Sequence, residues 1–258
     1  MWLFDLREII VSKKYVVYTA LFGSYDFLTD ISHLSSSDIE YICFTDIECN
    51  NNLGWKIVKV SNFSSTPAMM NRYYKLHPHC YFSNYDASLY VDANIKIKSN
   101  LNLFFEKYIA KGDFLIPQHE QRNCIFKEAK ECIVLKKGNE KIITRQMLNY
   151  KKDGMPVGYG LGENNILFRK HNAPEIKKIM ADWWEELVKE SQRDQLSLAY
   201  VMWKNNKKLE FLDETCRNTN DYFEYQTHKK YTNRSVLEKF KDRFFILSRR
   251  IKYHRWCV

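Results

Sequence analysis

The stretch Leu89-Tyr90-Val91-Asp92-Ala93-Asn94-Ile95 indicates the fold most directly. Its first three residues are aliphatic or aromatic, as in a buried strand, and two side chains with oxygen atoms follow, Asp92 and Asn94. Because these side chains are two positions apart on an extended backbone, they lie on the same side and can bind one hard divalent cation. A strand that ends in an Asx turn would show the same residues.

The regions around this strand alternate between strand-like and helix-like patterns. Runs rich in β-branched and aromatic residues occur at 15–22, 40–45, 55–60, 87–91, 113–116, 165–169 and 208–212. Helical periodicity occurs at 67–77, 100–109, 173–190 and 193–204. The alternation predicts an α/β fold with a largely parallel central sheet flanked by helices. No internal repeat or Pro/Gly-rich linker interrupts the pattern, so we expect a single domain over 1–228 and a basic amphipathic C-terminal helix within 229–258.

Composition points to an intracellular globular protein. The chain has 258 residues, of which 45% are hydrophobic, and its seven cysteines include no CxxC pair of a zinc ribbon or redox site. Charges at Asp5, Arg7 and Glu8 argue against a signal peptide, and the longest apolar run, 15–22, is too short to cross a bilayer. We therefore expect a cytoplasmic protein, peripheral at the inner face of the membrane.

The positive charge is concentrated near the C-terminus. Of the formal net charge of +9, eight charges belong to residues 229–258, which carry ten Lys or Arg residues against Glu238 and Asp242. The rest of the chain is nearly neutral, so nucleic acid is not expected as a partner.

The same region has the pattern of an amphipathic helix. From Ser235 onward, apolar residues at spacings of 3, 4, 3 and 4 form one helical face with Leu237, Phe240, Phe244, Leu247 and Ile251. The basic residues on other faces are Lys239, Lys241, Arg243, Arg249, Arg250 and Lys252. Such a helix is typical of binding to an anionic membrane surface, and docking on an adjoining protein is the alternative.

The loop after the first predicted strand has the features of a nucleotide site. Gly23 lets the backbone approach a ligand closely, Tyr25 can stack on a planar base, and Asp26 can accept hydrogen bonds from ring or ribose donors. A tight turn with a Tyr packed in the core would explain the same residues. The loop lacks the GxGxxG pattern, which disfavours a Rossmann dinucleotide site.

Polar residues also follow two later strands. A polar wall over a sugar or its diphosphate can be formed by His119, Arg122 and Glu128. The planar guanidinium group of Arg suits phosphate because it donates two parallel hydrogen bonds. The plain alternative is an Arg–Glu surface pair. His228 is the candidate for a third metal ligand, although a His at such a position is more often solvated.

Four segments follow the order of motifs in a known enzyme family. They are NRYYKLHP at 71–78, the Asp92 strand with SNLNLF at 99–104, GENNILFR at 162–169 and QRDQLS at 192–197. Together they resemble glycosyltransferase family 8, with Asn94 in place of the second Asp of that family's strand motif. A neutral carboxamide is a weaker ligand for a hard cation than a carboxylate.

A second set of segments extends over most of the chain. It comprises YTALFGSYD at 18–26, CFTD at 43–46, YVD at 90–92 and HEQRNCIFKEA at 119–129. This set resembles a group of bacterial and plant proteins formerly catalogued as a domain of unknown function and now regarded as glycosyltransferase-like.

These resemblances imply a GT-A-like domain that transfers a sugar from a nucleoside diphosphate sugar, with UDP as the expected nucleotide and Mn²⁺ or Mg²⁺ as the expected cation. The acceptor would be a glycan or a lipid-linked sugar, as in the synthesis of surface polysaccharides. The implied catalytic residues are Asp194, Gln195 and Glu163, and the implied metal ligands are Asp92, Asn94 and His228. The implied nucleotide-sugar-binding residues are Thr19, Phe22, Gly23, Tyr25, Asp26, Asp46, Arg72, Lys75, Asp92, Asn94, His119, Arg122 and Asn164.

The residues leave several alternatives open. A metal-dependent hydrolase of an amide or ester would need several His or carboxylate ligands, of which only Asp92 is a strong one. A non-catalytic polyanion-binding protein would rely on the basic C-terminal region. The stereochemistry of transfer is also open, because Asp194 would be a general base in an inverting reaction and a charge stabiliser in a retaining one.

Overall fold

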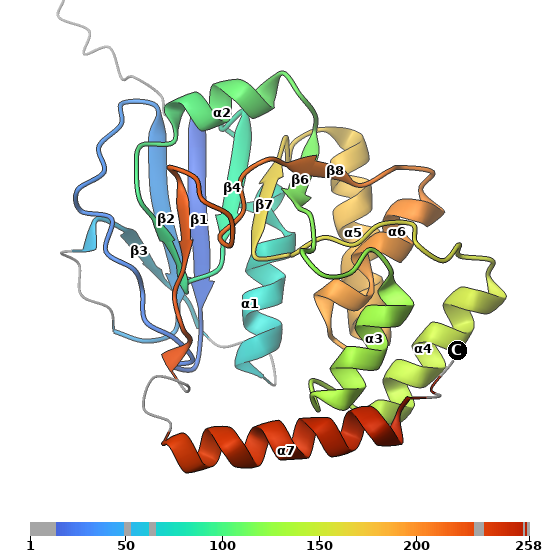
Figure 1. The fold of residues 1–258 in the computed structure, drawn as a ribbon. Helices are drawn as coiled ribbons and strands as arrows, with labels where there is room; N and C mark the ends of the chain where they lie inside the picture. Colours follow the sequence, from blue (N-terminus) through green and yellow to red (C-terminus); the bar gives the residue numbers. More distant parts are fainter. Residues whose placement is uncertain (1–13, 49–52, 62–65, 230–234, 255, 257–258) are drawn as a thin grey trace, which may run out of the picture.

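The computed structural model describes residues 14–48, 53–61, 66–229, 235–254 and 256 (Figure 1). The strands are β1 (Tyr15–Leu21), β2 (Ile39–Thr45), β3 (Lys56–Lys59), β4 (Ala87–Val91), β5 (Ile95–Ile97), β6 (Phe114–Pro117), β7 (Ile166–Arg169), β8 (Glu210–Leu212) and β9 (Phe223–Tyr225). The α-helices are α1 (Pro67–Leu76), α2 (Asn102–Ile109), α3 (Ile125–Val134), α4 (Glu140–Lys152), α5 (Pro174–Lys189), α6 (Leu198–Lys204) and α7 (Val236–Lys252). Two short 3₁₀ helices are η2 (Pro78–Cys80) and η3 (Asp194–Leu196).

The main sheet is mostly parallel, which confirms the predicted fold class. Its strand order is β3-β2-β1-β4-β7-β6-β8, and within the described residues only β7 runs antiparallel to its neighbours. The pairs β1–β2, β1–β4, β2–β3 and β6–β8 are parallel. A separate small sheet pairs β5 with β9 in antiparallel fashion, so that Ile95 lies opposite Tyr225.

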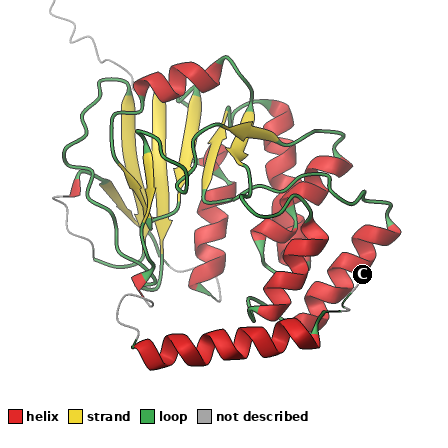
Figure 2. Cartoon of the chain, viewed as in Figure 1, coloured by secondary structure: helices red, strands yellow, loops and turns green. Residues whose placement is uncertain are grey.

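Both faces of the main sheet are buried. In β1, Val16 and Tyr18 belong to one hydrophobic core and Tyr15 and Val17 to the other, because successive side chains point to opposite faces. Residues of α1 and α3 to α6 close the first core, and residues of α2 and the small sheet close the second. Helices flank the sheet, whereas α7 lies apart from the strands along one end of the molecule (Figure 2).

The predicted strands correspond to the seven strands of the main sheet, to within two residues at each end. The patterns at 67–77, 100–109 and 173–190 form α1, α2 and α5. The single helix expected over 193–204 is wrong, because the segment divides into η3 and α6 at Ser197. There the Ser197 hydroxyl donates to the Asp194 carbonyl oxygen at 3.2 Å, and the Asp194 carbonyl also accepts from the buried Trp183 indole.

A buried Arg fixes the carboxyl end of α1 to the sheet. Arg169 of β7 is fully buried, and its guanidinium donates to the Lys75 carbonyl oxygen at 2.8 Å. The Tyr18 hydroxyl of β1 donates to the same oxygen at 2.9 Å and accepts from Arg169. Burial raises the pKa of Tyr18 to about 12 and lowers that of Arg169. These bonds set the position of Lys75 relative to β1 and β7.

Candidate active site

The residues singled out from the sequence gather at one edge of the main sheet. Because β1, β2 and β4 are parallel, the segments that follow them, at 22–26, 46 and 92–94, emerge at the same edge. Because β7 is antiparallel to β4, the segment that precedes it, 163–165, reaches this edge as well. The Asp92 backbone N–H donates to the Asn165 carbonyl oxygen at 2.8 Å and joins the two segments directly.

A buried Lys pairs with two carboxylates at this edge. Lys75 is 3% exposed, and its Nζ lies 2.6 Å from Oδ2 of Asp194 and 3.9 Å from Oδ1 of Asp92. Arg72, one turn earlier in α1, places Nη2 3.9 Å from Oδ1 of Asp194. The Tyr90 hydroxyl donates to Oδ1 of Asp92 at 2.8 Å. Two acidic and two basic groups therefore share one site, which we call the Lys75 cluster (Arg72, Lys75, Asp92 and Asp194).

The backbone that presents Asp194 is held in an unusual turn. Gln192 has a φ of 56°, a conformation that costs a non-glycine residue about 1 kcal/mol or more, and its carbonyl oxygen accepts from Arg72 Nε at 3.0 Å. The Gln195 N–H donates to Oδ1 of Asp194 at 3.0 Å. With the Trp183 bond to the Asp194 carbonyl, these contacts fix the carboxylate toward Lys75.

The two carboxylates of the cluster differ in their proton affinity. Burial would raise the pKa of Asp194, but the charges of Lys75 and Arg72 outweigh it and hold that pKa well below its usual range. Burial, aided by the negative charge of Asp194, raises the pKa of Asp92 despite the attraction of Lys75. Asp194 is therefore a persistent anion, whereas the charged form of Asp92 would gain from a further cation.

A second polar group adjoins the Lys75 cluster through Gln195. The Gln195 side-chain amide donates to the Gly162 carbonyl oxygen at 3.1 Å, beside Glu163. Glu163 is 7% exposed, and Arg217 Nε lies 2.8 and 3.0 Å from its two carboxylate oxygens. The Asn165 amide donates to Glu163 Oε2 at 3.1 Å. Two donors therefore orient the Glu163 carboxylate.

His119, Arg122 and Glu128 lie together beside this second group. Arg122 Nε donates to Glu128 Oε2 at 2.6 Å, and His119 Nδ1 accepts from the backbone N–H of Arg122 at 3.2 Å. Burial lowers the pKa of His119. The negative charges of Glu128 and Glu163 act to raise this pKa, and the positive charges of Arg122 and Arg217 act to lower it. The three residues thus form one bonded group in which only Glu128 is buried, and contact with a sugar or diphosphate stays a prediction.

The segment between β9 and α7 returns to the same edge. The Asn94 amide nitrogen donates to the Gln226 carbonyl oxygen at 3.0 Å, and the Gln226 N–H donates to the Asn94 carbonyl oxygen at 2.9 Å. His228 Nδ1 lies 2.6 Å from Oδ2 of Asp26, and the Lys229 N–H donates to Oδ1 of Asp26 at 2.9 Å. The side chain of His228 therefore contacts the predicted nucleotide loop.

The predicted metal ligands do not form a dense acidic site. In the part of the chain that the structure describes, no group of three or more His, Cys, Asp or Glu side chains is placed to hold a metal ion. Of the three predicted ligands, Asp92 and His228 are of these residue types, whereas Asn94 is not. Metal binding stays a prediction.

The structure gives Gly23 another role besides the predicted one. Gly23 has a φ of 64°, and a Cβ at this position would lie 2.6 Å from the ring of Pro67, so its close approach is to the start of α1. The Gly23 N–H donates to Oδ1 of Asp46 at 3.0 Å, which joins the loops after β1 and β2.

The other predicted ligand-binding residues differ in exposure. Thr19 and Phe22 are buried, and the Phe22 ring stacks on Tyr74. Tyr25 is 54% exposed and contacts the His228 ring edge-on. Asn164 is 7% exposed, and its amide nitrogen has no hydrogen-bond partner among the described residues.

Comparison with protein families assigns the chain. The profile of the TOD1/MUCI70 glycosyltransferase-like domain matches residues 4–228. The chain belongs to this family. The assignment confirms the predicted resemblance to glycosyltransferase-like proteins. No curated protein matches the sequence.

Two solved structures are similar to this TOD1/MUCI70 protein at low sequence identity. The apo form of mouse xyloside xylosyltransferase 1 is 7% identical over 78% of this chain and 86% of that chain, with a TM-score of 0.45. The apo WbbM bifunctional glycosyltransferase is 12% identical over 96% of this chain and 46% of that chain, with a TM-score of 0.47.

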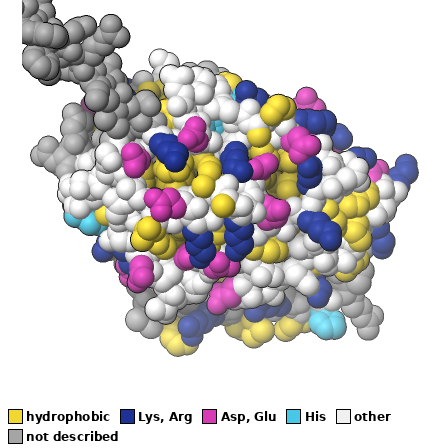
Figure 3. Space-filling model, turned by 90° about the horizontal axis from the view of Figure 1, so that it is seen from above, with side chains coloured by type: hydrophobic (Ala, Val, Ile, Leu, Met, Phe, Trp, Pro, Cys, Tyr) yellow, Lys and Arg dark blue, Asp and Glu magenta, His cyan; other side chains and the backbone are white. Residues whose placement is uncertain are grey.

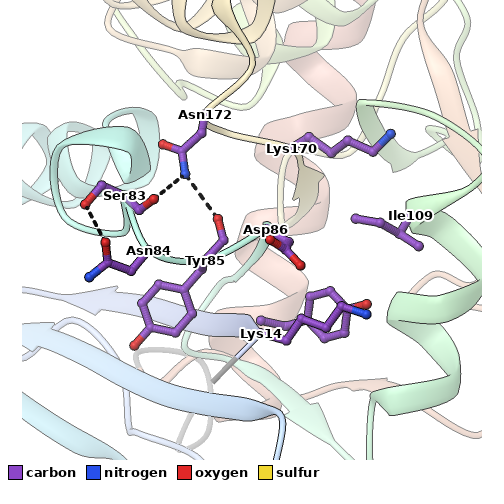
Figure 4. A pocket seen from close by; sticks show the side chains of 9 residues that line it. Lys14, Ser83, Asn84, Tyr85, Asp86, Ile109, Lys170 and Asn172 are labelled. Carbon is purple, nitrogen blue, oxygen red and sulfur yellow. Dashed lines mark hydrogen bonds between the residues drawn. The ribbon is translucent and has the colours of Figure 1, made fainter. Parts of the chain in front are cut away.

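A cavity of about 580 Å³ lies at the opposite edge of the sheet, at the amino ends of β1 and β4 (Figure 4). Asn172 donates to the carbonyl oxygens of Ser83 and Tyr85 at its rim, at 3.1 Å each. Seen from above, basic and acidic side chains are interspersed on the molecule (Figure 3). Because ligands of open α/β sheets bind beyond the carboxyl ends of the strands, we do not place the donor site of this TOD1/MUCI70 protein here.

Sequence reasoning missed Arg217, the partner of Glu163. It follows β8 in the polar run Cys216-Arg217-Asn218-Thr219-Asn220. Polar residues that directly follow a strand mark the ligand edge of an α/β sheet, so this run is a signal that the sequence itself contains.

We expect Lys75→Met to destabilise the protein by about 3–5 kcal/mol, because Asp194 would stay buried with only the more distant Arg72 as a cation. The double variant Lys75→Met/Asp194→Asn should recover most of this loss, since no buried charge is left unpaired there. Urea unfolding at pH 7 measures both. A double variant as unstable as Lys75→Met alone would contradict the ion-pair account.

Proposed function

We propose that this protein transfers a sugar from a nucleoside diphosphate sugar, with UDP as the nucleotide, to a glycan or lipid-linked acceptor. The observation that carries the proposal is the Lys75 cluster at the carboxyl ends of parallel strands, in a chain of a glycosyltransferase-like family. Ligands of open α/β sheets bind at this edge. A GT-A-like organisation of the domain is part of the same proposal.

The predicted cation ligands fit a hard divalent cation, Mn²⁺ or Mg²⁺, by their chemistry. Asp92 has a raised pKa, so a cation would favour its charged form. The Asn94 amide bonds Gln226 through its nitrogen, which leaves the oxygen as the metal-binding atom. His228 bonds the Asp26 carboxylate through Nδ1, the arrangement that usually accompanies metal binding through Nε2. Mg²⁺ sites commonly take further ligands from substrate phosphates and water, which suits so small a set of protein ligands.

When bound, the cation would neutralise the diphosphate and promote its departure. Lys75 and Arg72 would support the same charge, and the loop with Tyr25, Asp26 and Asp46 would bind the nucleoside. Thr19 and Phe22 would support this loop from the core, and Asn164, His119 and Arg122 would face the sugar and diphosphate.

Asp194 is assigned to the stabilisation of positive charge at the anomeric carbon. An effective general base has a pKa near the working pH, whereas the pKa of Asp194 is held far below it by Lys75 and Arg72. A persistent carboxylate is suited to an oxocarbenium-like centre. A retaining reaction is therefore favoured, with Gln195 beside the same centre and Glu163 as the second candidate.

The transfer itself conserves all atoms. The acceptor hydroxyl oxygen bonds to the anomeric carbon, and the bond from that carbon to the diphosphate breaks with its electron pair on the diphosphate. In a retaining reaction the hydroxyl proton leaves with the diphosphate, and in an inverting one it passes to a carboxylate.

The hydrolase alternative has less support. Such a hydrolase needs several His or carboxylate ligands, and among the described residues no group of three or more His, Cys, Asp or Glu side chains is placed to hold a metal ion. The polyanion-binding alternative does not explain why charged groups are buried at the strand ends.

We expect nucleoside diphosphates to raise the melting temperature, with UDP giving the largest shift and Mn²⁺ increasing it. A ligand at 100 times its Kd stabilises by roughly 2.7 kcal/mol. Asp92→Ala should abolish the Mn²⁺-dependent part, and Asn94→Asp should preserve or enlarge it because a carboxylate binds the cation more strongly. Asn84→Asp, at the opposite edge, is the control and should leave the shifts unchanged. No shift with any nucleotide would overturn the proposal.

We propose further that α7 binds an anionic membrane surface, which would place the enzyme at the inner face of the membrane. The helix lies along one end of the molecule (Figure 1). Its side chains Phe240, Phe244, Leu247 and Ile251 are 57–77% exposed. The side chain of Leu237, predicted for the same stripe, lies outside the described residues. None of the described helices has the length and apolar character needed to span a membrane.

The opposite side of α7 packs on the domain. Arg249 donates to the carbonyl oxygens of Ile133 and Val134 at the end of α3, and Arg250 pairs with Glu131 at 2.7 Å. These two Arg residues therefore hold α7 against the domain. Exposed basic side chains that can contact lipid headgroups include Lys241, Arg243 and Lys252. An adjoining protein is the other possible partner of the exposed stripe.

We expect Phe244→Ser/Ile251→Ser to weaken binding to phosphatidylglycerol-containing vesicles at least about tenfold, because each buried apolar side chain contributes roughly 1.5–3 kcal/mol. Val157→Ser is the matched control, since Val157 and Phe244 are both 77% exposed. Raising the salt concentration should weaken wild-type binding by screening the basic residues. Vesicle co-sedimentation measures each effect. Equal binding of all variants would rule out the membrane role.

A further inference from the structure

A second cavity, of about 560 Å³, opens beside the candidate active site. We call it the β9 cavity. Its lining comes from the loop after β8, from β9 and from two other loops, and includes Lys98, Glu120, Arg217, Thr219, Glu224 and Tyr225.

Two residues of the β9 cavity wall are bonded to the active-site edge. Arg217 Nε donates to both carboxylate oxygens of Glu163, and Cys216 Sγ lies 3.2 Å from the Asn165 amide nitrogen. The pKa of Cys216 is raised to about 11, first by burial and then by the charge of Glu163, and Asp92 contributes as well. The cavity is therefore close to the carboxylates proposed to act on the donor.

The lining has the chemistry of a site for a neutral polyhydroxyl ligand. The formal charges of the lining residues sum to zero, with Lys98 and Arg217 positive and Glu120 and Glu224 negative. Tyr225 is 38% exposed and offers apolar ring surface, and amide and hydroxyl groups supply further hydrogen bonds.

Two unpaired buried atoms lie in the adjoining segment 163–165, which is bonded to the cavity wall through Arg217 and Cys216. The Asn164 amide nitrogen and the Asn165 amide oxygen are buried and have no partner among the described residues. One is a donor and the other an acceptor, and a hydroxyl group can pair with either.

We propose that the β9 cavity is the acceptor subsite and binds the neutral sugar residue whose hydroxyl receives the transferred sugar. The proposal rests on the glycosyltransferase function proposed above. Arg217 is a positioning residue in this account, because it orients Glu163 at the boundary between the cavity and the Lys75 cluster.

The test separates acceptor binding from donor chemistry. UDP-sugars are supplied as donors together with neutral methyl glycosides of glucose, galactose and N-acetylglucosamine as acceptors. Both transfer to the glycoside and hydrolysis of the donor are measured. Thr219→Trp, which fills the β9 cavity, should lower the ratio of transfer to hydrolysis at least about tenfold, equivalent to 1.4 kcal/mol. Asn84→Trp fills the cavity at the opposite edge and should keep the wild-type ratio.

A second variant avoids reliance on a large side chain. Glu224→Ala removes one carboxylate that would accept hydrogen bonds from acceptor hydroxyl groups, so the KM for the methyl glycoside should rise. The melting temperature of Glu224→Ala should be no lower than that of the control Asn84→Trp. An unchanged KM together with an unchanged ratio in Thr219→Trp would overturn the subsite.

Charged acceptors test the proposed ligand class. Wild-type protein should prefer the neutral methyl glycosides to methyl glucuronide, and a preference for the glucuronide would contradict a neutral subsite. If the wild-type protein neither hydrolyses nor transfers from any nucleotide sugar, the proposed function fails and the subsite with it. Normal hydrolysis, with a ratio unaffected by Thr219→Trp and a KM unaffected by Glu224→Ala, would reject the subsite alone.

Discussion

The buried ion pair between Lys75 and Asp194 is the interaction on which the candidate site depends. A buried ammonium group costs several kcal/mol unless it is paired, and Lys75 obtains its closest partner 119 residues along the chain. The backbone carbonyl of the same residue is held by Arg169 and Tyr18 from two strands. One residue thus connects α1, the main sheet and the turn that carries Asp194, so the geometry of the site and the packing of the core are set together.

This arrangement prepares the charges of the site before a ligand arrives. Asp194 is kept ionised by two basic groups, whereas Asp92, with its raised pKa, still favours a further cation. Electrostatic stabilisation is most effective when the charged groups are already oriented in a site that excludes water. The bonded pairs of Glu163 with Arg217 and of Asp26 with His228 extend the same principle to both sides of the cluster.

The fold was largely predictable because its strands are runs of apolar residues and its helices begin at clear signals, as at Thr66-Pro67. The reversal of β7 was not predictable, since strand direction leaves no mark in the residue pattern. The helices α3 and α4 were missed although their sequences carry a helical period, with buried residues at 125, 129, 132 and 133 and at 143, 146, 147 and 150. The strands β5 and β9 could not be predicted because each is only three residues long. The sequence pointed to Asp92, Asp194 and Lys75 separately, but the pairing of Lys75 with both carboxylates follows only from the tertiary structure. The same holds for the pairing of Glu163 with Arg217.

The central claim is that Asp194 stabilises charge during sugar transfer rather than only completing a buried ion pair. It is tested most directly by the rate of UDP release from UDP-sugars by wild-type protein and by Asp194→Asn, with melting temperatures measured in parallel. The account predicts that the rate falls by roughly 10²-fold or more while the protein stays folded at the assay temperature. An unchanged rate in a variant that melts at a lower temperature would contradict the claim and reduce Asp194 to a structural role.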